Sequence, residues 1–502
     1  MQPVAESGNI RTFTLFYTSD THGNIVSAPD TIGLDLIASI KSAEPHSLLL
    51  DAGDFLHGTR LTDSDQGVSV FTLMKQAGYF ATAIGNHEFS YGREALAQVR
   101  DIATKPPVLH LLSANVIGQD GRLMFEESAT ANVNGVQLCV FGITTPDTET
   151  HSNPEYVQGL LFNDPETAAA STVEKLQANG CDFIVGLTHL GSDGSTHNSL
   201  QLAEPVDGLD VLIDGHSHLV VEHRQGDGAL VVSPGAYGKL LGKLDVTFDT
   251  RRGKVESIYN TFITPEAASA YSPDPQVSSG IARLLEKDAV AMREVIGYSE
   301  ARLVFNKSLM RSRETALGDF CADALRNAYG SKPFTNQPLA DIAIINSGAI
   351  GAALPDGKVT RGDIHALARF GGHVVLLKVN GRELRDILEH AVSFFPAEDG
   401  AFAQISGLRA GVDATKAPGS RIVSLELPVS PCIGFEEVKP HDEFVLAVND
   451  YLASGGDGFP HLATKARLRE DITLYEALSE HLKNRGSGNY SDADFRIVYH
   501  GR

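Results

Sequence analysis

Six short β-rich runs between residues 11 and about 250 alternate with helix-like stretches, and this alternation is the strongest constraint on the fold. The runs are RTFTLFYT, SLLLDAG, YFATAIG, VQLCVFGI, DFIVGLT and DVLIDG. Helix-like stretches between several of them cover residues 35–41, 68–77, 93–103 and 165–179. Strands that alternate with helices are typical of layered α/β domains. The pattern therefore predicts an α/β domain in the first half of the chain.

A second domain is expected to begin near residue 300. Residues 264–275 (TPEAASAYSPDP) carry three prolines and are interpreted as a linker, followed by an amphipathic helix over about 277–295. Further on, apolar stripes at helical spacing lie among the β-rich runs DIAIIN, HVVLLKV and EFVLAVN. A chain of 502 residues is long enough for two or three cores. We predict domains at 10–263 and 299–502, joined by a linker and connecting helix at 264–298.

Composition narrows the range of partners. The formal net charge of −22 disfavours nucleic-acid polymers and anionic membranes. A small anionic substrate stays compatible with this charge where metal ions or a few arginines reverse the field locally. No apolar run approaches the roughly 18 residues that suggest a membrane span. Residues 1–9 are interpreted as a loose leader, and the start MQPVAESGNIR lacks the features of a signal peptide.

The four cysteines, Cys139, Cys181, Cys321 and Cys432, include no CxxC pair. Cys139 and Cys181 lie in or next to apolar strands. We interpret them as buried free thiols. On this interpretation the cysteines do not identify a redox compartment.

Five of the β-rich runs end in Asp, Asn or His beside glycine. The polar residues at these ends are Asp20, His22, Asp54, Asn86, His189, His216 and His218. Functional groups gather at the carboxyl ends of strands in layered α/β sheets, so these seven side chains are expected on one rim. Any one segment alone is more simply interpreted as a turn or as solvated histidines. Five segments together favour a metal site.

Seven ligands are more than one metal ion takes from a protein. They suit two divalent ions that share one carboxylate, and the mixture of nitrogen and oxygen favours Mn, Fe, Zn or Co over Ca or Mg. Two such ions clamp the attacking and leaving oxygens of a phosphoryl transfer and lower the pKa of bound water. The pattern therefore indicates phosphoester chemistry.

The segments TSDTHGNI, DAGDFLHGT, GNHEFSYG, THLG and DGHSHL, in this order, resemble the metallophosphoesterase domain of the 5'-nucleotidase and UDP-sugar hydrolase family. RSRETALGDF, INSGAIG, FGG and YLASGGDGF resemble its C-terminal nucleotide-binding domain. The resemblance covers nearly the whole chain. It implies an α/β fold with an N-terminal four-layer α/β/β/α sandwich and a second, mixed α/β substrate-binding domain.

The resemblance also implies roles for the metal-type residues. One ion takes Asp20, His22, Asp54 and His218, and the other takes Asp54, Asn86, His189 and His216, with Asp54 bridging. His87 matches the family's catalytic histidine, which contacts the phosphate under attack and stabilises charge on its oxygens. Glu88 is expected to orient the loop.

The second domain carries the residues that the resemblance assigns to the nucleotide. Phe370 and Tyr451 match the aromatic pair that sandwiches the base, and stacking of this kind tolerates different bases. Asp457 matches the residue that binds the ribose hydroxyls, Asn346 is expected to touch the base, and Arg311 matches a substrate-binding arginine.

Two positions depart from the family pattern. Ser90 stands where an aspartate usually pairs with the catalytic histidine, and it offers a hydrogen bond without the charge. We therefore expect His87 to be less readily protonated, so that activity falls earlier as pH rises; a pH–rate profile beside Ser90→Asp tests this. Gly351 stands where an arginine is expected, while Arg311 is kept and Arg313 lies close enough to supplement it. Two outcomes are open: bulky anionic substrates bind more weakly, or Arg313 or Arg369 rebuilds the phosphate contacts.

These features predict a phosphohydrolase that uses two divalent ions to release phosphate from nucleoside 5'-monophosphates. UDP-sugars or 2',3'-cyclic nucleotides are alternative substrates, and a nucleoside-binding protein with weak catalysis is an alternative of another class. The expected partner is a small nucleotide or nucleoside, with no nucleic-acid polymer and no membrane span. Family members are mostly exported, which implies a periplasmic or secreted location.

Overall fold

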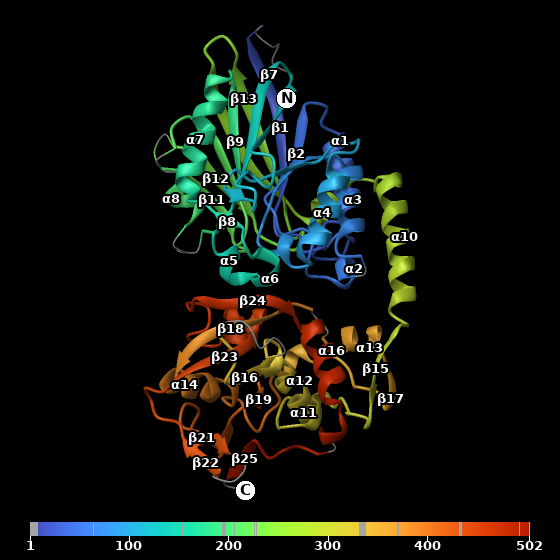
Figure 1. The fold of residues 1–502 in the computed structure, drawn as a ribbon, viewed down its shortest axis with the longest axis vertical. Coiled ribbons are helices and arrows are strands. Elements are labelled where there is room, and N and C mark those ends of the chain that lie inside the picture. Colours follow the sequence, from blue (N-terminus) through green and yellow to red (C-terminus); the bar gives the residue numbers. More distant parts are fainter. Residues whose placement is uncertain are drawn as a thin grey trace. The chain divides into compact units, whose positions relative to one another are not determined.

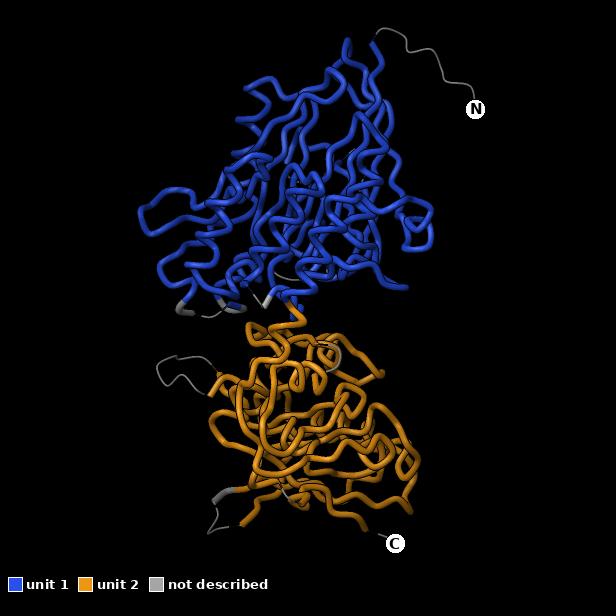
Figure 2. Tube along the Cα trace, turned by 90° about the vertical axis from the view of Figure 1, so that its right-hand side faces the viewer, with its two compact units in different colours: residues 1–287 blue, residues 288–502 orange. Residues whose placement is uncertain are grey.

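The computed structural model describes residues 9–500 apart from 64, 153, 193–196, 205, 225, 227, 331–337, 369–370, 431–433 and 491. The chain divides into two compact units, residues 1–287 and 288–502 (Figure 2). Each unit has its own sheets and its own hydrophobic cores.

Two six-stranded sheets form the middle of the first unit. The first has the order β14-β13-β1-β2-β3-β4, with β1 (Ile10–Thr18), β2 (Ser47–Asp51), β3 (Tyr79–Ala83), β4 (His110–Leu112), β13 (Leu241–Asp249) and β14 (Lys254–Ile263). The second has the order β11-β12-β10-β9-β7-β6, with β6 (Ser128–Val133), β7 (Val136–Thr144), β9 (Phe183–His189), β10 (Val211–Asp214), β11 (Val220–Arg224) and β12 (Leu230–Pro234). In each sheet four neighbouring strands run parallel, so their carboxyl ends lie at one edge.

Helices cover the outer faces of both sheets (Figure 1). The first sheet packs against α1 (Leu34–Ser42), α3 (Val68–Ala77) and α4 (Gly92–Ala103). The second packs against α7 (Pro165–Ala178) and α8 (Ser199–Leu202). Between the sheets, side chains such as Phe13 and Phe183 meet edge to face, with ring centroids 5.3 Å apart. These layers confirm the expected four-layer α/β/β/α sandwich.

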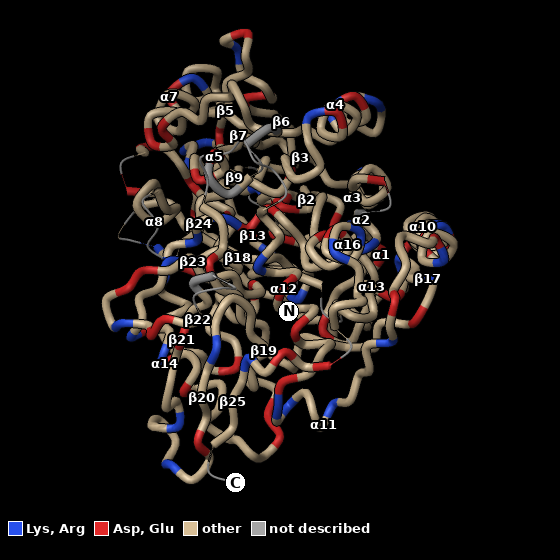
Figure 3. Tube along the Cα trace, turned by 60° about the horizontal axis from the view of Figure 1, so that its bottom comes forward, with Lys and Arg blue, Asp and Glu red and all other residues tan. Residues whose placement is uncertain are grey.

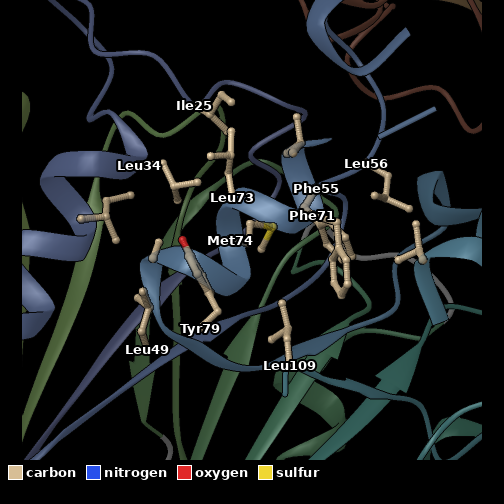
Figure 4. Close-up of a cluster of buried hydrophobic side chains, with 14 of the residues drawn as sticks. Ile25, Leu34, Leu49, Phe55, Leu56, Phe71, Leu73, Met74, Tyr79 and Leu109 are labelled. Carbon is tan, nitrogen blue, oxygen red and sulfur yellow. The ribbon is translucent and has the colours of Figure 1, made fainter. Parts of the chain in front are cut away.

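The core beneath the first sheet anchors a loop that carries a predicted ligand. Phe55 directly follows Asp54 and is fully buried. Its ring stacks on Phe71 of α3 with centroids 5.7 Å apart (Figure 4). A large aromatic side chain gains most from burial, so this contact fixes the chain next to the ligand.

Shorter elements complete the first unit. They are α2 (Arg60–Asp63), the 3₁₀ turn η1 (His87–Phe89), β5 (Val116–Ile117), α5 (Thr148–His151), α6 (Pro154–Val157), β8 (Leu161–Phe162) and α9 (Pro265–Ala268). The 17-residue helix α10 (Pro275–Ala291) includes the boundary between the two units, at residues 287 and 288. The helix predicted over 277–295 is α10. The proline at its first position is one that a helix accepts without losing a hydrogen bond.

A five-stranded mixed sheet is the centre of the second unit. Its order is β19-β16-β23-β18-β24, with β16 (Ile342–Asn346), β18 (His373–Asn380), β19 (Ala403–Ser406), β23 (Glu443–Asn449) and β24 (Arg467–Thr473). Alternate residues of β16 and β18 enter two separate cores. One core contains α12 (Ala316–Asn327) and α16 (Leu474–Arg485), and the other contains α14 (Gly381–Ala391). The second unit is thus the expected mixed α/β domain.

The rest of the second unit consists of smaller sheets and short helices. A four-stranded sheet has the order β22-β21-β20-β25, with β20 (Arg409–Asp413), β21 (Ile422–Ser430), β22 (Gly434–Glu437) and β25 (Ile497–His500), while β15 (Val295–Ser299) pairs with β17 (Gly357–Thr360). The short helices are α11 (Lys307–Met310), η2 (Ser347–Ala349), α13 (Arg361–Leu367), α15 (Asp450–Ala453), η3 (Gly456–Gly458) and η4 (Gly488–Tyr490).

The interpretation of Cys139 and Cys181 as free thiols is wrong, because these residues form a disulfide. β7 and β9 are parallel neighbours, with Leu138 opposite Phe183, and this pairing brings the two Cα atoms to 5.9 Å. That separation suits a disulfide. The cysteines are 42 positions apart in the sequence, so only the strand order reveals the pair. Cys321 is a buried free thiol, and Cys432 lies outside the described residues.

Two further observations bear on the expected partners. Among the described residues we find no helix with the length and apolar character needed to span a bilayer. Lysine and arginine positions are interspersed with aspartate and glutamate positions along the trace (Figure 3). This mixed pattern offers no support for binding a nucleic-acid polymer, which calls for a basic stripe.

Candidate metal centre and nucleotide site

The seven predicted metal ligands gather at the carboxyl ends of five parallel strands. β1, β2 and β3 of the first sheet lead into Asp20, His22, Asp54 and Asn86, while β9 and β10 of the second sheet lead into His189, His216 and His218. They form two groups. Asp20, His22 and His218 have ligand atoms within 4.8 Å of one another, and so have Asp54, His189 and His216. Each group therefore draws on both sheets.

Two of the histidines have a fixed proton position. Nδ1 of His189 donates to the carbonyl of Ala52 at 2.7 Å, and Nδ1 of His22 donates to the carbonyl of His57 at 2.8 Å. In the neutral rings Nε2 then carries a lone pair. A carbonyl partner on the far nitrogen is the usual way in which a protein orients a metal-binding imidazole.

The fixed Nε2 atoms face carboxylate oxygen. Nε2 of His189 lies 3.0 Å from Oδ2 of Asp54, yet it makes no hydrogen bond of acceptable geometry with any described residue. Nε2 of His22 lies 3.1 Å from Nε2 of His218 and 3.9 Å from the same Oδ2 of Asp54. A lone pair facing a carboxylate oxygen is repulsive unless positive charge lies between them, either a proton on Nε2, which Asp54 favours by raising the pKa of His189, or a metal ion in its place. The donor set therefore fits metal ions, and Asp54 lies where both groups can share it.

Burial makes a cation necessary for these carboxylates. Asp20 and Asp54 are almost completely inaccessible to solvent. Burial raises the pKa of Asp20 well above its usual range. Burial, the largest single cause, acts in the same direction on Asp54, but positive charge on His189, His87 and His22 together outweighs it and holds the pKa of Asp54 well below its usual range. Two buried carboxylates this close keep their charge only beside a positive partner.

The backbone at the ligands adopts an uncommon conformation. Asp20, His22, Asp54, His216 and His218 all have positive φ, between 47° and 79°. Such conformations cost about 1–3 kcal/mol each for residues other than glycine and concentrate at functional sites. The surrounding contacts must therefore hold all five residues in place.

Glycines give the ligand side chains room. A Cβ atom at Gly85 would lie 2.2 Å from Oδ1 of Asp54, and one at Gly215 would lie 2.8 Å from Oδ2 of Asp20. Any side chain at either position would displace a ligand carboxylate. This explains why glycine accompanies the ligands at these strand ends.

Glu88 holds the Asp54 loop, as expected. Its carboxylate accepts hydrogen bonds from the backbone N–H of Asp54 at 2.9 Å, Phe55 at 2.9 Å, Leu56 at 3.2 Å and Gly85 at 2.7 Å. Glu88 is 1% exposed. One buried carboxylate thus ties the loop after β2 to the loop after β3.

His87 lies between the ligands and Ser90. Its backbone N–H donates to Oδ1 of Asp54 at 2.9 Å, and its Nδ1 lies 3.1 Å from Oγ of Ser90. Its ring stacks on that of His57 with centroids 5.5 Å apart and meets His22 at 5.2 Å. The serine therefore supplies the hydrogen bond that an aspartate supplies in the family pattern.

Tyr237 is a site residue that the sequence analysis missed. Its backbone N–H donates to the carbonyl of Asp20 at 2.8 Å, and its φ is 64°. Its ring centroid lies 5.2 Å from that of His218 and 5.6 Å from that of His22. The motif SPGAYG gave a signal, since a glycine-flanked tyrosine follows β12, but it contains no metal-type side chain.

The predicted nucleotide-binding residues lie in the second unit. Asn346 ends β16, Arg311 follows α11, and Tyr451 and Asp457 flank the glycine-rich turn after α15. The guanidinium of Arg311 borders Gly400, 3.9 Å from where a Cβ atom would stand. The side-chain amide of Asn346 is buried and hydrogen-bonded to Asp457 and Asn449, and its expected contact with the base stays a prediction.

Two residues of the predicted pocket lie outside the described residues, namely Phe370 and Arg369. Their roles stay predictions. Gly351, where an arginine was expected, donates its N–H to the carbonyl of Leu367 at 2.9 Å.

Comparison with known proteins agrees with this arrangement. Residues 13–220 match the calcineurin-like phosphoesterase family, and residues 295–464 match the 5'-nucleotidase C-terminal domain. The structure of a 5'-nucleotidase precursor from Thermus thermophilus is 29% identical, with a TM-score of 0.58, and the match covers 98% of this chain and 100% of that one. The chain belongs to the 5'-nucleotidase family.

Curated relatives carry related names. Human 5'-nucleotidase is 28% identical over 494 residues, which cover 89% of this chain and 83% of the human protein. A trifunctional nucleotide phosphoesterase of Bacillus subtilis is 28% identical over 516 residues, and this chain spans only 34% of that longer protein. As a member of the 5'-nucleotidase family the protein is a phosphoesterase, and its relatives support nucleotides as substrates.

Proposed function

We propose that the protein releases phosphate from nucleoside 5'-monophosphates with the help of two divalent metal ions. The observation that carries the proposal is the pair of histidines, His22 and His189, whose Nδ1 atoms are committed to carbonyl oxygens while Nε2 faces the carboxylate of Asp54. Metal ions placed among these atoms would receive the Nε2 lone pairs and share the carboxylate of Asp54, which supports the proposal.

The residues divide into two ligand sets. One ion is held by Asp20, His22 and His218, the other by Asn86, His189 and His216, with Asp54 shared. The 3.0 Å contact between Nδ1 of His216 and Oδ1 of Asn86 supports placing these two side chains at the same ion. Mn, Zn, Fe and Co all suit such mixed ligands.

Two bound ions would supply an activated water and positive charge to the phosphoryl oxygens. The protein's own part is to place the ester and to bind the charge that grows on it. His87 is suited to this because Asp54 fixes its backbone and Ser90 lies at its Nδ1. The leaving 5'-oxygen takes its proton from solvent or from His87.

The second unit is proposed to hold the nucleoside. Tyr451 is 50% exposed and offers a ring face to the base, with Phe370 as its expected partner. Asp457 is exposed and faces the sugar, and Arg311 provides positive charge for the anionic part of the substrate. The acidic chain needs such local cations to receive an anion.

The disulfide supports an exported location. Disulfides persist in oxidising compartments and are rare in the cytosol. The Cys139–Cys181 bond therefore favours a periplasmic or secreted protein. Trapping free thiols in protein taken directly from its native compartment tests this, because a reduced pair would contradict it.

The test of the activity is hydrolysis of AMP, UMP, UDP-glucose and 2',3'-cyclic AMP, measured as phosphate release for the two monophosphates and as separated nucleotide products for UDP-glucose and the cyclic nucleotide. The protein is stripped of metal and then given Mn, Zn, Co or Mg, with His216→Ala as the inactive control. Fast, metal-dependent release from a nucleoside monophosphate supports the proposal. Preference for UDP-glucose or the cyclic nucleotide points to that ester instead. Adenosine binding without any release points to a binding protein.

A further inference from the structure

A chain of side-chain hydrogen bonds ends on the carboxylate of Asp457. Nδ2 of Asn449 donates to Oδ1 of Asn346 at 3.2 Å, and Nδ2 of Asn346 donates to Oδ2 of Asp457 at 3.0 Å. From the other side, the hydroxyl of Tyr451 donates to Oδ1 of Asp457 at 2.8 Å. Each carboxylate oxygen thus has one side-chain donor from the described residues.

Tyr451 itself is held on two sides. Its hydroxyl also accepts the backbone N–H of Asp457 at 3.1 Å. One face of its ring lies on Gly456, where a Cβ atom would come within 2.5–2.6 Å of three ring carbons. The ring is nevertheless 50% exposed. The tyrosine therefore has a fixed position and an open surface, and its hydroxyl is committed to the carboxylate.

The protonation state of the phenol is suited to this contact. The hydrogen bond to Asp457 raises the pKa of Tyr451, so the hydroxyl stays a donor at neutral pH. Hydrogen bonds to a charged acceptor are stronger than neutral ones and fix its orientation. Asp457 is consequently held although its side chain is exposed and its φ is 52°.

The carboxylate keeps room for a ligand. An ionised carboxylate has about four acceptor positions, two on each oxygen. Asn346 and Tyr451 use one on each, which leaves one on each oxygen. Two acceptor positions on adjacent oxygens match two hydroxyl donors on adjacent carbons, which is the arrangement of a vicinal cis-diol.

We propose that the Tyr451 hydroxyl and the Asn346 amide are positioning residues that set a preference for ribonucleotides over 2'-deoxyribonucleotides. They hold Asp457 so that both oxygens accept from the 2'- and 3'-hydroxyls. Asn346 acts through Asp457, and Asn449 fixes the orientation of its amide. The inference rests on the proposed function, because it takes the nucleoside to bind beside Asp457.

The decisive variant is Tyr451→Phe, which keeps the ring and removes the hydroxyl. Binding of adenosine and 2'-deoxyadenosine to the metal-free protein is measured by calorimetry, beside wild type and Tyr298→Phe, which removes an exposed hydroxyl elsewhere in the second unit. We expect Tyr451→Phe to lose about tenfold in adenosine affinity and little in 2'-deoxyadenosine affinity, the effect of one hydrogen bond to a charged group. Tyr298→Phe should match wild type.

A second measurement separates this inference from the proposed hydrolysis. In the metal-loaded enzyme, Tyr451→Phe should raise KM for AMP about tenfold, leave KM for 2'-deoxy-AMP nearly unchanged and leave kcat unchanged. If nothing is hydrolysed, the proposed function fails while the binding ratios still test the inference. An unchanged or larger ratio of adenosine to 2'-deoxyadenosine affinity in Tyr451→Phe overturns it.

A double-mutant cycle with Asp457→Asn guards against a general loss of structure. Because the hydroxyl acts through the carboxylate, the double variant should have the same ratio of adenosine to 2'-deoxyadenosine affinity as Asp457→Asn alone. Additive losses would show that Tyr451 acts independently of Asp457 and would also overturn the inference.

Discussion

The metal rim of the first unit and the carboxylate of the second unit both lie near the ends of parallel strands, yet they are built differently. On the rim, five of the seven ligands have positive φ and five of the seven are buried. In the second site Asp457 is the one proposed ligand-binding residue among those described that has positive φ, and the exposed side chains of Asp457 and Tyr451 are bonded to each other, with the buried Asn346 behind them. The rim is held mainly by backbone contacts, and the second site by side chains. Buried charged ligands must be held close together by a rigid backbone, whereas exposed groups that bind a sugar can be solvated by water when the sugar leaves.

This comparison predicts the largest effect at the shared carboxylate. Asp54→Asn removes the charge that both ion positions use, so phosphate release should fall by more than the roughly 10²–10³-fold that loss of one transition-state donor costs. Asp210→Asn is the matched control, since the carboxylate of Asp210 accepts from the backbone N–H of Ile184, far from the ligand-bearing end of β9. Comparable activity losses in both variants would show that Asp54 is merely structural.

A smaller effect is expected at Glu88, which holds the rim without facing the substrate. Glu88→Gln replaces a charged acceptor of four backbone N–H groups by an amide. Loss of such a supporting contact typically weakens metal affinity about 10–100-fold. Metal titration followed by calorimetry measures this. Wild-type affinity in a folded variant would show that the backbone frame is unnecessary.

Ser90 gives a still smaller effect, because its hydroxyl makes one hydrogen bond to Nδ1 of His87. Ser90→Ala should lower kcat about tenfold, the value of one such bond, with little change in KM. Ser90→Asp restores an acceptor and should retain wild-type kcat or exceed it. Equal kcat in Ser90→Ala and wild type would mean that stacking on His57 alone orients the ring.

The disulfide should affect stability and leave catalysis unchanged. It joins Cys139 to Cys181, before the start of β9, whereas His189 is the last residue of that strand. For a loop of 42 residues the chain-entropy estimate is about 4 kcal/mol. The double variant Cys139→Ser, Cys181→Ser should therefore melt several degrees lower, by calorimetry, with unchanged kcat at room temperature. A loss of activity at that temperature would connect the disulfide to the rim.

Much of the rim could be predicted because its chemistry is local in the sequence. Each strand is a short apolar run, and each ligand follows within a few residues of its end, as with His189 after DFIVGLT. What the sequence could not show was that β9 and β10 belong to a different sheet from β1, β2 and β3. Which of the two sheets a strand joins depends on its pairing with strands far away in the sequence.

The errors and omissions have the same cause. Cys139 and Cys181 meet only because β7 and β9 are neighbours. The hydrogen bonds of Asn346 were not foreseen, because its partners Asn449 and Asp457 are more than 100 positions away. Tyr237 carries no metal-type group and reaches His22 and His218 only in the folded chain.

The central claim is that two ions share Asp54, and metal content tests it most directly. Wild type and Asp54→Asn are loaded with Mn, passed through gel filtration and analysed by mass spectrometry of the metal. We predict two ions per chain in wild type and a loss of both from Asp54→Asn. One ion per chain in wild type, or two retained in the variant, would contradict the shared carboxylate and the dinuclear centre.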